Sequence, residues 1–337
     1  MIVLPRPLSD IVSTAIPLYP AFLIFLKVEY KLLAASFILF VFDYINLRKL
    51  PPFFNYQFRL RYFKTEEKKN IKSISHNSFR EILRHYKFDK EFIEIVYHAD
   101  LPALSGLGSS SSSTVGMINA VNAYKNVRLS KKKLYNEAIK IEQQILKENV
   151  GSQDQANAAY GGFNFIEFNK NNIKVDNIKN KKNVNKLEKS ILLIFTGMQR
   201  HSQIIEKDKI NSINKKKSIH NLLTMKDITY EAKKLIMSNN FNQKYFGQLL
   251  NEQWKLKKDL SRRVTNNKID EIYNGALNMG AFGGKLLGAG AGGFLMLVCD
   301  SATKKRIKKK YFKLMNIPIK FENEGSKILY LDNSSFN

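Results

Sequence analysis

The most regular alternation of apolar and polar residues along the chain begins at residue 93. Over residues 93–101, one face of the pattern consists of Ile93, Ile95, Tyr97, Ala99 and Leu101. This period of two predicts a β-strand with unlike faces. After a turn at Pro102 and a run of glycine and serine, Val115, Ile118 and Val121 recur at steps of three, which predicts a helix beginning near the serines.

The rest of the pattern predicts a mixture of helices and strands. One helix is predicted over residues 131–147, where apolar residues recur at steps of four, three and four. Further helices are predicted around residues 225–237, 246–260, 269–277 and 304–314, and strands over residues 191–195, 294–298 and 327–331. Such a mixture implies an α/β or α+β fold with two layers.

A polar, lysine-rich stretch interrupts this pattern at residues 169–189. We interpret it as a surface connection or a poorly packed hairpin, with a domain boundary near its end. The length of 337 residues also favours two domains. We therefore expect one domain over residues 1–188 and a second over residues 189–337.

The first 45 residues contain an apolar run at residues 32–42. The run is too short for a transmembrane helix, which needs about 20 residues. The chain also starts without the basic segment and cleavage site of a signal peptide. We expect buried structure here, with an interfacial membrane segment as the less favoured alternative, and the lack of an address signal favours the cytoplasm.

Composition excludes several classes of protein. The 55 Lys and Arg residues exceed the 29 Asp and Glu residues, and the net charge of +26 raises the question of nucleic acid, membranes or anionic substrates. Most of these cations are lysines that accompany many Asn, Ile and Phe residues, as a strongly AT-biased genome would produce, and no nucleic-acid recognition motif accompanies them. The single cysteine, Cys299, and five scattered histidines predict neither a disulfide framework nor a zinc site.

The segment SGLGSSSSS at residues 105–113 carries candidate chemistry. Glycines let the backbone approach a ligand, hydroxyls bind phosphate or magnesium, and a following helix N-terminus offers free N–H groups. A flexible linker is the alternative, but linkers are not placed between a strand and an amphipathic helix. The P-loop motif is excluded, because Lys285 is followed by Leu286 and Met279 stands at the required first glycine.

Three segments in this order resemble the GHMP kinases. PALSGLGSSSSS, QDQ and KLLGAGAGG, at residues 102–113, 153–155 and 285–293, are similar to the second, catalytic and third motifs of that family. ENVGSQDQANAAYGG, TGMQRHS, FENEGSKILY and RKLPPFF also resemble its sugar-1-kinase branch. The resemblance covers about residues 44–331.

This resemblance implies an α+β two-domain GHMP kinase-like fold, with an N-terminal domain like the second domain of ribosomal protein S5 and a ferredoxin-like C-terminal domain. It implies transfer of the γ-phosphoryl group of ATP to a phosphorylated sugar, in that branch at the anomeric hydroxyl of a heptose 7-phosphate. Residues that would wrap the ATP phosphates are Ser105, Gly106, Leu107, Gly108, Ser109, Ser110, Ser111, Gly288 and Gly290.

The resemblance gives further roles to Ser110, Glu142 and Asp154, and the affinity of cations for phosphate gives roles to Arg200 and Lys285. Ser110 and Glu142 would hold Mg²⁺, and Asp154 would orient or deprotonate the acceptor hydroxyl. Arg200 and Lys285 would meet the phosphate of the sugar. The alternatives are an exposed helix residue for Glu142, a turn residue for Asp154, ordinary surface charges for Arg200 and Lys285, and a glycine-rich strand entry without a ligand for the third motif.

The departure from the family lies at the start of the chain. The GGGTD loop of the first motif is absent, only Arg6 and Pro7 echo its pattern, and no glycine occurs before Gly106. A translated frameshift or a diverged paralogue would explain this. Two hypotheses follow: an active sugar kinase, and a degenerate member that binds nucleotide without catalysis.

Overall fold

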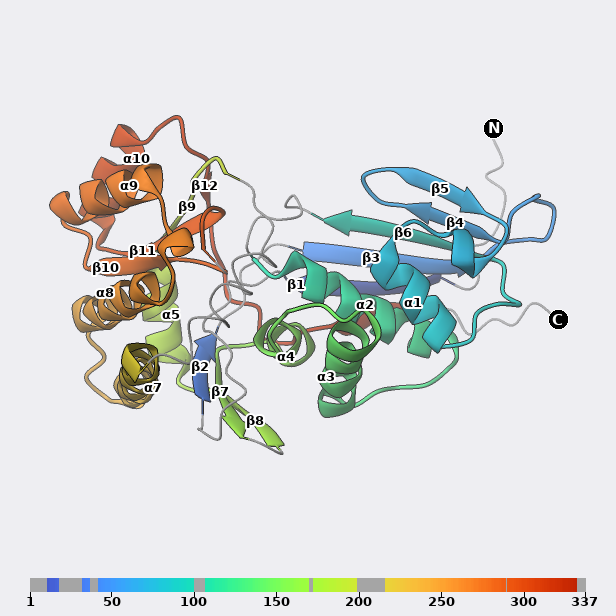
Figure 1. The fold of residues 1–337 in the computed structure, drawn as a ribbon, viewed down its shortest axis with the longest axis horizontal. Coiled ribbons are helices and arrows are strands. Elements are labelled where there is room, and N and C mark those ends of the chain that lie inside the picture. Colours follow the sequence, from blue (N-terminus) through green and yellow to red (C-terminus); the bar gives the residue numbers. More distant parts are fainter. Residues whose placement is uncertain are drawn as a thin grey trace, which may run out of the picture.

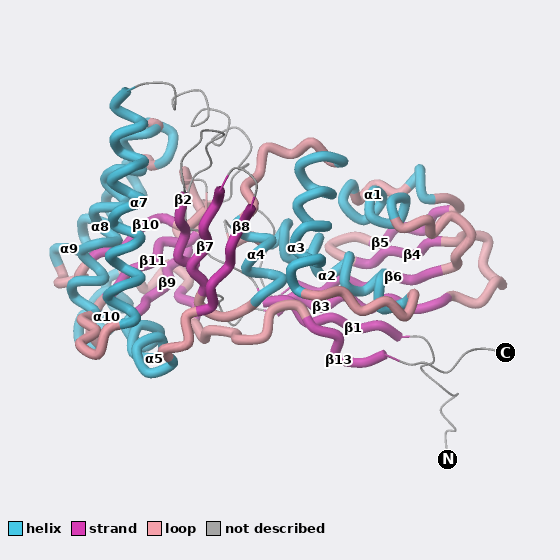
Figure 2. Tube along the Cα trace, turned by 90° about the horizontal axis from the view of Figure 1, so that it is seen from below, coloured by secondary structure: helices cyan, strands magenta, loops and turns pink. Residues whose placement is uncertain are grey.

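The computed structural model describes residues 11–17, 32–36, 42–99, 107–169, 172–198, 216–288 and 290–331. They form an elongated molecule with a sheet and its covering helices at each end (Figure 1). A smaller sheet lies between α7 on one side and α4 on the other (Figure 2). The helices pack against sheets, as the mixed pattern predicts.

The first sheet has six strands in the order β13-β1-β3-β6-β4-β5. Their bounds are β1 Ile11–Pro17, β3 Phe42–Lys49, β4 Phe58–Arg61, β5 Thr65–Lys68, β6 Ile93–Ala99 and β13 Lys327–Leu331. Neighbouring strands are antiparallel, except that β4 and β6 are parallel. The strand predicted from residue 93 is therefore confirmed as β6, in the middle of this sheet.

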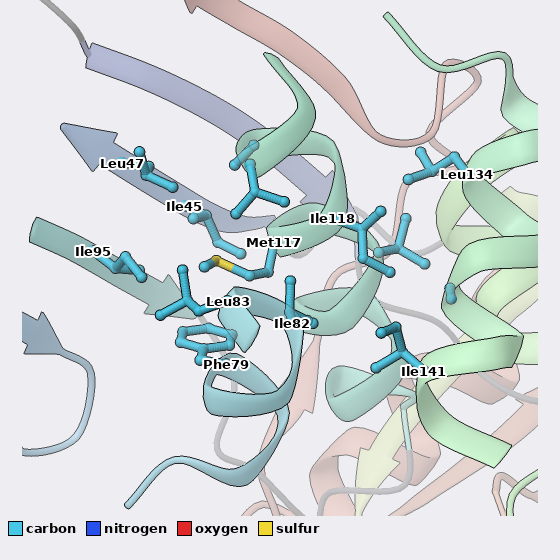
Figure 3. Packing of buried hydrophobic residues seen from close by; sticks show 14 of the residues in the cluster. Ile45, Leu47, Phe79, Ile82, Leu83, Ile95, Met117, Ile118, Leu134 and Ile141 are labelled. Atoms are coloured by element: carbon cyan, nitrogen blue, oxygen red, sulfur yellow. The ribbon is translucent and has the colours of Figure 1, made fainter. Parts of the chain in front are cut away.

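Helices cover one face of the first sheet. The 3-10 turn η1 (Ile71–Ser73) precedes α1 (Asn77–His85), and α2 (Ser109–Tyr124) follows β6. Figure 3 shows Ile45 and Ile95 of the sheet packed toward Phe79 of α1 and Met117 of α2. All residues of α2 from 111 to 123 are buried, because strands and helices surround it. α2 is therefore the central element of this half, and its start at the serine run is confirmed.

Two further helices lie beside α2. α3 (Lys131–Ile139) begins after the N-cap Ser130, whose hydroxyl accepts a hydrogen bond from the N–H of Lys133. It continues into a π-helical turn, η2 (Lys140–Ile145), and α4 (Gln153–Tyr160) follows. The helix predicted over residues 131–147 is confirmed, but nothing in the apolar pattern indicated its π-helical turn.

The second sheet has four antiparallel strands in the order β10-β11-β9-β12. Their bounds are β9 Ile191–Phe195, β10 Gly283–Leu286, β11 Phe294–Val298 and β12 Asn316–Ile317. Leu193 and Met296 enter one core, whereas Leu192 and Leu295 enter another, because successive side chains of a strand point to opposite faces. Both faces of this sheet are therefore buried.

Helices supply the other side of both cores. α5 (Lys181–Ser190), α7 (Lys216–Met237) and α8 (Gln243–Leu260) contribute to the first of these cores. α8 also contributes Trp254 to the second core, with α9 (Asn267–Asn278) and α10 (Ser301–Lys310), and η3 (Arg262–Val264) joins α8 to α9. The helices and strands predicted beyond residue 190 are confirmed, with shifts at their ends.

The polar stretch at residues 169–189 has more structure than a surface connection. The hairpin of β7 (Asn164–Asn169) and β8 (Asn172–Asn177) pairs with β2 (Leu32–Ser36) in a three-stranded sheet, and α5 follows. Val184 and Leu187 of α5 are buried at a helical spacing of three. Two apolar residues on one face are thus enough to dock a helix that is otherwise polar.

The altered N-terminal residues lie mostly outside the described part of the chain. Only β1 and β2 are described within residues 1–41, and β2 occupies part of the apolar run. Among the described residues, no helix is both long and apolar enough to cross a bilayer.

The end of the chain returns to the first half of the molecule. Before β13, the N–H of Ser326 donates to the carbonyl of Ala158 at 2.7 Å, and the carbonyl of Glu322 accepts from Gly162 at 2.7 Å. Gly161 and Gly325 meet backbone to backbone at this point. β13 thus belongs to the first sheet, although it lies within the range expected for the second domain. The division of the chain at residue 188 stays a prediction.

Replacement of Gly325 by alanine tests how much this contact stabilises the fold. Gly325 has a φ of +71°, and a Cβ there would lie 2.6 Å from the carbonyl oxygen of Ala159. Left-handed strain and overpacking together should lower the free energy of unfolding by about 3 kcal/mol or more. In the control Gly197→Ala, φ is +78° but the nearest atom is 3.7 Å away, and the expected loss is about 1–2 kcal/mol. Equal losses in urea denaturation would contradict the role of the contact.

Candidate active site

The N-terminus of α2 is the first component of the site. Gly108 precedes the helix with a φ of +76° and supplies no side-chain cap. Gly108 itself offers no side chain to the first N–H groups of α2, and the first turn of the helix contains no acidic residue. A helix end of this kind attracts anions through its N–H groups and its dipole.

A buried carboxylate, that of Glu142, lies beside this helix end. Glu142 is only 1% exposed. Its Oε2 accepts hydrogen bonds from Ser111 Oγ, at 3.0 Å, and from Gln155 Nε2. Its Oε1 is buried and has no hydrogen-bond partner among the described residues. The interpretation of Glu142 as an exposed helix residue is therefore wrong.

The buried carboxylate is carried by a π-helical turn. Both Ile141 and Glu142 of η2 are buried, and Glu142 follows the buried Ala138 of α3 by four residues. The N–H of Leu146 bonds to the carbonyl of Ile141, a step of five residues. Such turns widen a helix locally and are frequent at functional sites.

Burial changes the chemistry of Glu142. Loss of solvation raises the pKa of its carboxyl to about 7, which the hydrogen bond from Gln155 partly opposes. A cation bound at Oε1 would stabilise the charged form of this carboxylate. Magnesium fits, because it prefers oxygen ligands and keeps other positions for water and phosphate. Among the described residues, no three His, Cys, Asp or Glu side chains lie together in a way that could hold a metal ion.

Asp154 faces the same helix end from α4. It lies in the first turn of α4, between the buried side chains of Gln153 and Gln155. A Cβ placed on Gly108 would be 3.2 Å from both Cγ and Oδ2 of Asp154. The carboxylate thus rests against the glycine backbone of the serine-rich loop. Because Asp154 is helical, the interpretation as a turn aspartate does not hold.

The third motif forms a tight loop between β10 and β11. A Cβ on Gly290 would lie 2.6 Å from the carbonyl oxygen of Val264, and one on Gly292 would lie 2.8 Å from that of Met198. The two glycines are therefore required by neighbouring backbone, whatever ligand the loop meets. This packing requirement was not evident from the motif alone.

The structure brings some predicted residues together and leaves others apart. Ser111, rather than the exposed Ser110, contacts Glu142. The side chain of Leu107 packs in the core of the second half, so that only its backbone is left for a ligand. Ser109 is half-buried at the start of α2, and Gly288 follows β10. The predicted residues Ser105, Gly106 and Arg200 lie outside the described part of the chain.

Lys285 is not a surface charge. It is 1% exposed, and it stands on β10 opposite Met296 of β11. A second buried lysine, Lys257 of α8, was missed by the sequence analysis. Its signal was its position on the apolar stripe of α8, three residues from both Trp254 and Leu260. Gln155 was also missed, although it belongs to the QDQ segment.

Comparison with known families supports the sequence resemblance. Residues 74–162 match the GHMP kinases N terminal domain, and residues 234–316 match the GHMP kinases C terminal domain. Together these matches cover just over half of the chain.

Individual relatives are similar over much of the chain. It is 34% identical to D-glycero-alpha-D-manno-heptose 7-phosphate kinase of Campylobacter jejuni over 214 residues, and these residues are 63% of this chain. The alignment spans 62% of that relative's length. The chain is also 26% identical over 259 residues to homoserine kinase of Aliarcobacter butzleri, covering 74% of this chain and 79% of that protein.

Solved structures share the fold. A D-glycero-D-manno-heptose 1-phosphate kinase from Bacteroides thetaiotaomicron has a TM-score of 0.76 at 21% identity, covering 95% of this chain and 99% of that one. A mevalonate kinase has a TM-score of 0.72 at 19% identity, and the alignment covers 94% of this chain and 100% of that one. The predicted two-domain α+β fold is confirmed by this likeness.

The raised pKa of Glu142 predicts a pH-dependent stability. Between its ordinary value of 4.5 and about 7, the folded carboxyl holds a proton that the unfolded chain has released. The free energy of unfolding should therefore fall over this range as pH rises. In Glu142→Gln this loss, roughly 3 kcal/mol for such a shift, should be absent.

Urea denaturation in the presence of EDTA, at about pH 5 and about pH 8, measures this difference. Glu252→Gln is the control, because Glu252 is exposed and pairs with Lys255 at the surface. Its pH dependence should follow that of the original protein. If the free energy of unfolding depended on pH in the same way in Glu142→Gln and in the original protein, the folded state would not raise the pKa of Glu142.

Gly108→Ala should disturb both the backbone and Asp154. The left-handed φ makes a Cβ unfavourable, and the Asp154 carboxylate would have to move from its position. Stability should fall by about 1–2 kcal/mol, and kinase activity by roughly tenfold or more. In the control Gly280→Ala, φ is +101° and the neighbours at 3.3 Å are side-chain atoms of Arg306 and Thr303. A similar loss of activity in both variants would contradict the view that the loss in Gly108→Ala comes from displacement of Asp154.

Proposed function

The chain belongs to the GHMP kinase family, and we propose that it transfers the γ-phosphoryl group of ATP to a hydroxyl of a sugar. One observation carries this proposal: the Asp154 carboxylate rests on Gly108 at the uncapped start of α2, while the buried carboxylate of Glu142 lies behind the same turn. A catalytic carboxylate, a phosphate-binding helix end and a cation ligand are the parts that phosphoryl transfer needs.

The start of α2 would bind the phosphates of ATP. The first N–H groups of α2 and the hydroxyls of Ser109 and Ser110 are candidate donors at this end of the helix. Glu142 would hold Mg²⁺ through its open oxygen, together with Ser110 or Ser111. When bound, the ion offsets the negative charge of the phosphates.

Asp154 would act on the acceptor. A carboxylate within hydrogen-bond reach of a hydroxyl can orient it and accept its proton as the oxygen attacks phosphorus. Contact with Gly108 places Asp154 next to the backbone that would carry the phosphates. Orientation of both reactants in one place is a large part of the catalytic effect in such reactions.

For the acceptor, we propose D-glycero-D-manno-heptose 7-phosphate, phosphorylated at its anomeric hydroxyl. The support is the 34% identity to a relative with that substrate in its name. Arg200 and Lys285 are the cations that we propose for the phosphate already on the sugar. Both side chains are permanent or nearly permanent cations at neutral pH, and such groups suit phosphate oxygens.

A coupled ADP-release assay tests this function. The purified chain, with Mg²⁺ and ATP, is assayed against sugars that include the heptose 7-phosphate, and phosphorus NMR identifies the phosphorylated position. We expect sugar-dependent turnover that falls by roughly 100- to 10,000-fold in Asp154→Asn. Asp270→Asn is the matched control, because Asp270 occupies the first turn of α9 as Asp154 occupies that of α4. Binding of magnesium-ATP without turnover of any sugar would instead identify a non-catalytic nucleotide-binding protein.

A further inference from the structure

Lys257 is a buried cation for which the proposed reaction has no role. It lies on α8 and is 2% exposed. Its Nζ donates a hydrogen bond of 2.6 Å to the carbonyl of Gly288 and lies 3.5 Å from the carbonyl oxygen of Leu286. Removing an ammonium from water is costly unless polar partners replace the water, so this position is strongly constrained.

The two carbonyls belong to the entrance of the third glycine-rich loop. Leu286 ends β10, and Gly288 begins the loop with a φ of +66°. Farther along, the N–H of Ala291 donates to Val264 at 2.7 Å, and that of Gly293 donates to Met198 at 2.8 Å. These later contacts join neutral backbone groups, whereas the loop entrance is held by a charged side chain.

We propose that Lys257 is a positioning residue for ATP: it holds the Gly288 carbonyl toward α8, so that this acceptor oxygen does not face the phosphates. A carbonyl turned toward the phosphates would repel them. The ammonium also adds positive charge directly behind the loop, where water does not screen it.

This inference rests on the proposed function, because it assumes that the third loop meets the phosphates of ATP. It goes further by giving a role to a residue outside the three motifs. A purely structural role for Lys257 would affect stability and both substrates alike. A positioning role instead predicts a selective loss of affinity for the nucleotide.

Lys257→Met tests this inference, since methionine keeps the length of the side chain and removes its charge. The Kd and KM for ATP should rise by roughly 10- to 100-fold, as expected for one lost charge-assisted hydrogen bond. The KM for the sugar should stay unchanged. The thermal unfolding midpoint should fall by only a few degrees, because the Gly288 carbonyl loses its donor while methionine fills the same space. Lys257→Gln, which is neutral but still a donor, is the second variant if the first does not fold.

Lys258→Met is the matched control. Lys258 is the next residue of the same helix. Its Nζ lies 5.8 Å from the centre of the Trp254 ring, and that of Lys257 lies 5.9 Å from the same point. Unlike Lys257, Lys258 pairs with Asp270 instead of the loop. We expect its ATP affinity to equal that of the original protein. Unchanged ATP affinity in Lys257→Met, or an equal loss for ATP and sugar with a much lower unfolding midpoint, would overturn the positioning role.

Calorimetric titration with magnesium-ATP separates this inference from the proposed function. If the original protein binds magnesium-ATP but turns over no sugar, the proposed function fails, and the titrations of the two lysine variants still decide the role of Lys257. If the original protein does not bind magnesium-ATP, both proposals fail.

Discussion

The carboxylate of Glu142, taken out of water beside the first turn of α2, is the interaction on which the organisation of the site depends. α2 is enclosed on all sides from residue 111 onward, so the polar residues of its first turns cannot be solvated and must find partners within the protein. Ser111 and Gln155 supply part of that need by donating to one oxygen of Glu142. Gln155 comes from α4, and its neighbour Asp154 is thereby placed against Gly108. One buried carboxyl group thus connects three elements, α2, η2 and α4.

α4 is also held in place at its far end. That helix is fixed at its start by Gln155 and at its end by the returning chain before β13, where Gly161 and Gly325 approach more closely than any side chain would allow. Lys131 of α3 bonds both to the carbonyl of Tyr160, at 2.7 Å, and to that of Glu324, at 2.6 Å. α4 is therefore held at both ends, and a carboxylate carried on a helix so fixed has little freedom to leave its position.

Features that depend on local pattern could be predicted from the sequence, whereas those that depend on distant partners could not. β6, the start of α2 and the two central strands β9 and β11 follow from periodicity within a few residues. The π-helical turn that carries Glu142 has no apolar signature, and the glycines at 290 and 292 proved to be needed by the backbone of Val264 and Met198. Docking of α5 and burial of Lys257 likewise depend on elements far away along the chain, which a window of neighbouring residues does not contain.

Two buried charges of opposite sign stand behind the two loops of the site. Glu142 lies behind the start of α2, and Lys257 lies behind the entrance of the third loop. A buried charge is unfavourable in a low-dielectric interior unless hydrogen bonds or opposite charge offset it. A metal ion beside Glu142 and phosphate oxygens beside the third loop would each add opposite charge at these two positions. A bound magnesium-nucleotide would therefore gain electrostatic stabilisation at both loops, in addition to the hydrogen bonds that it makes there.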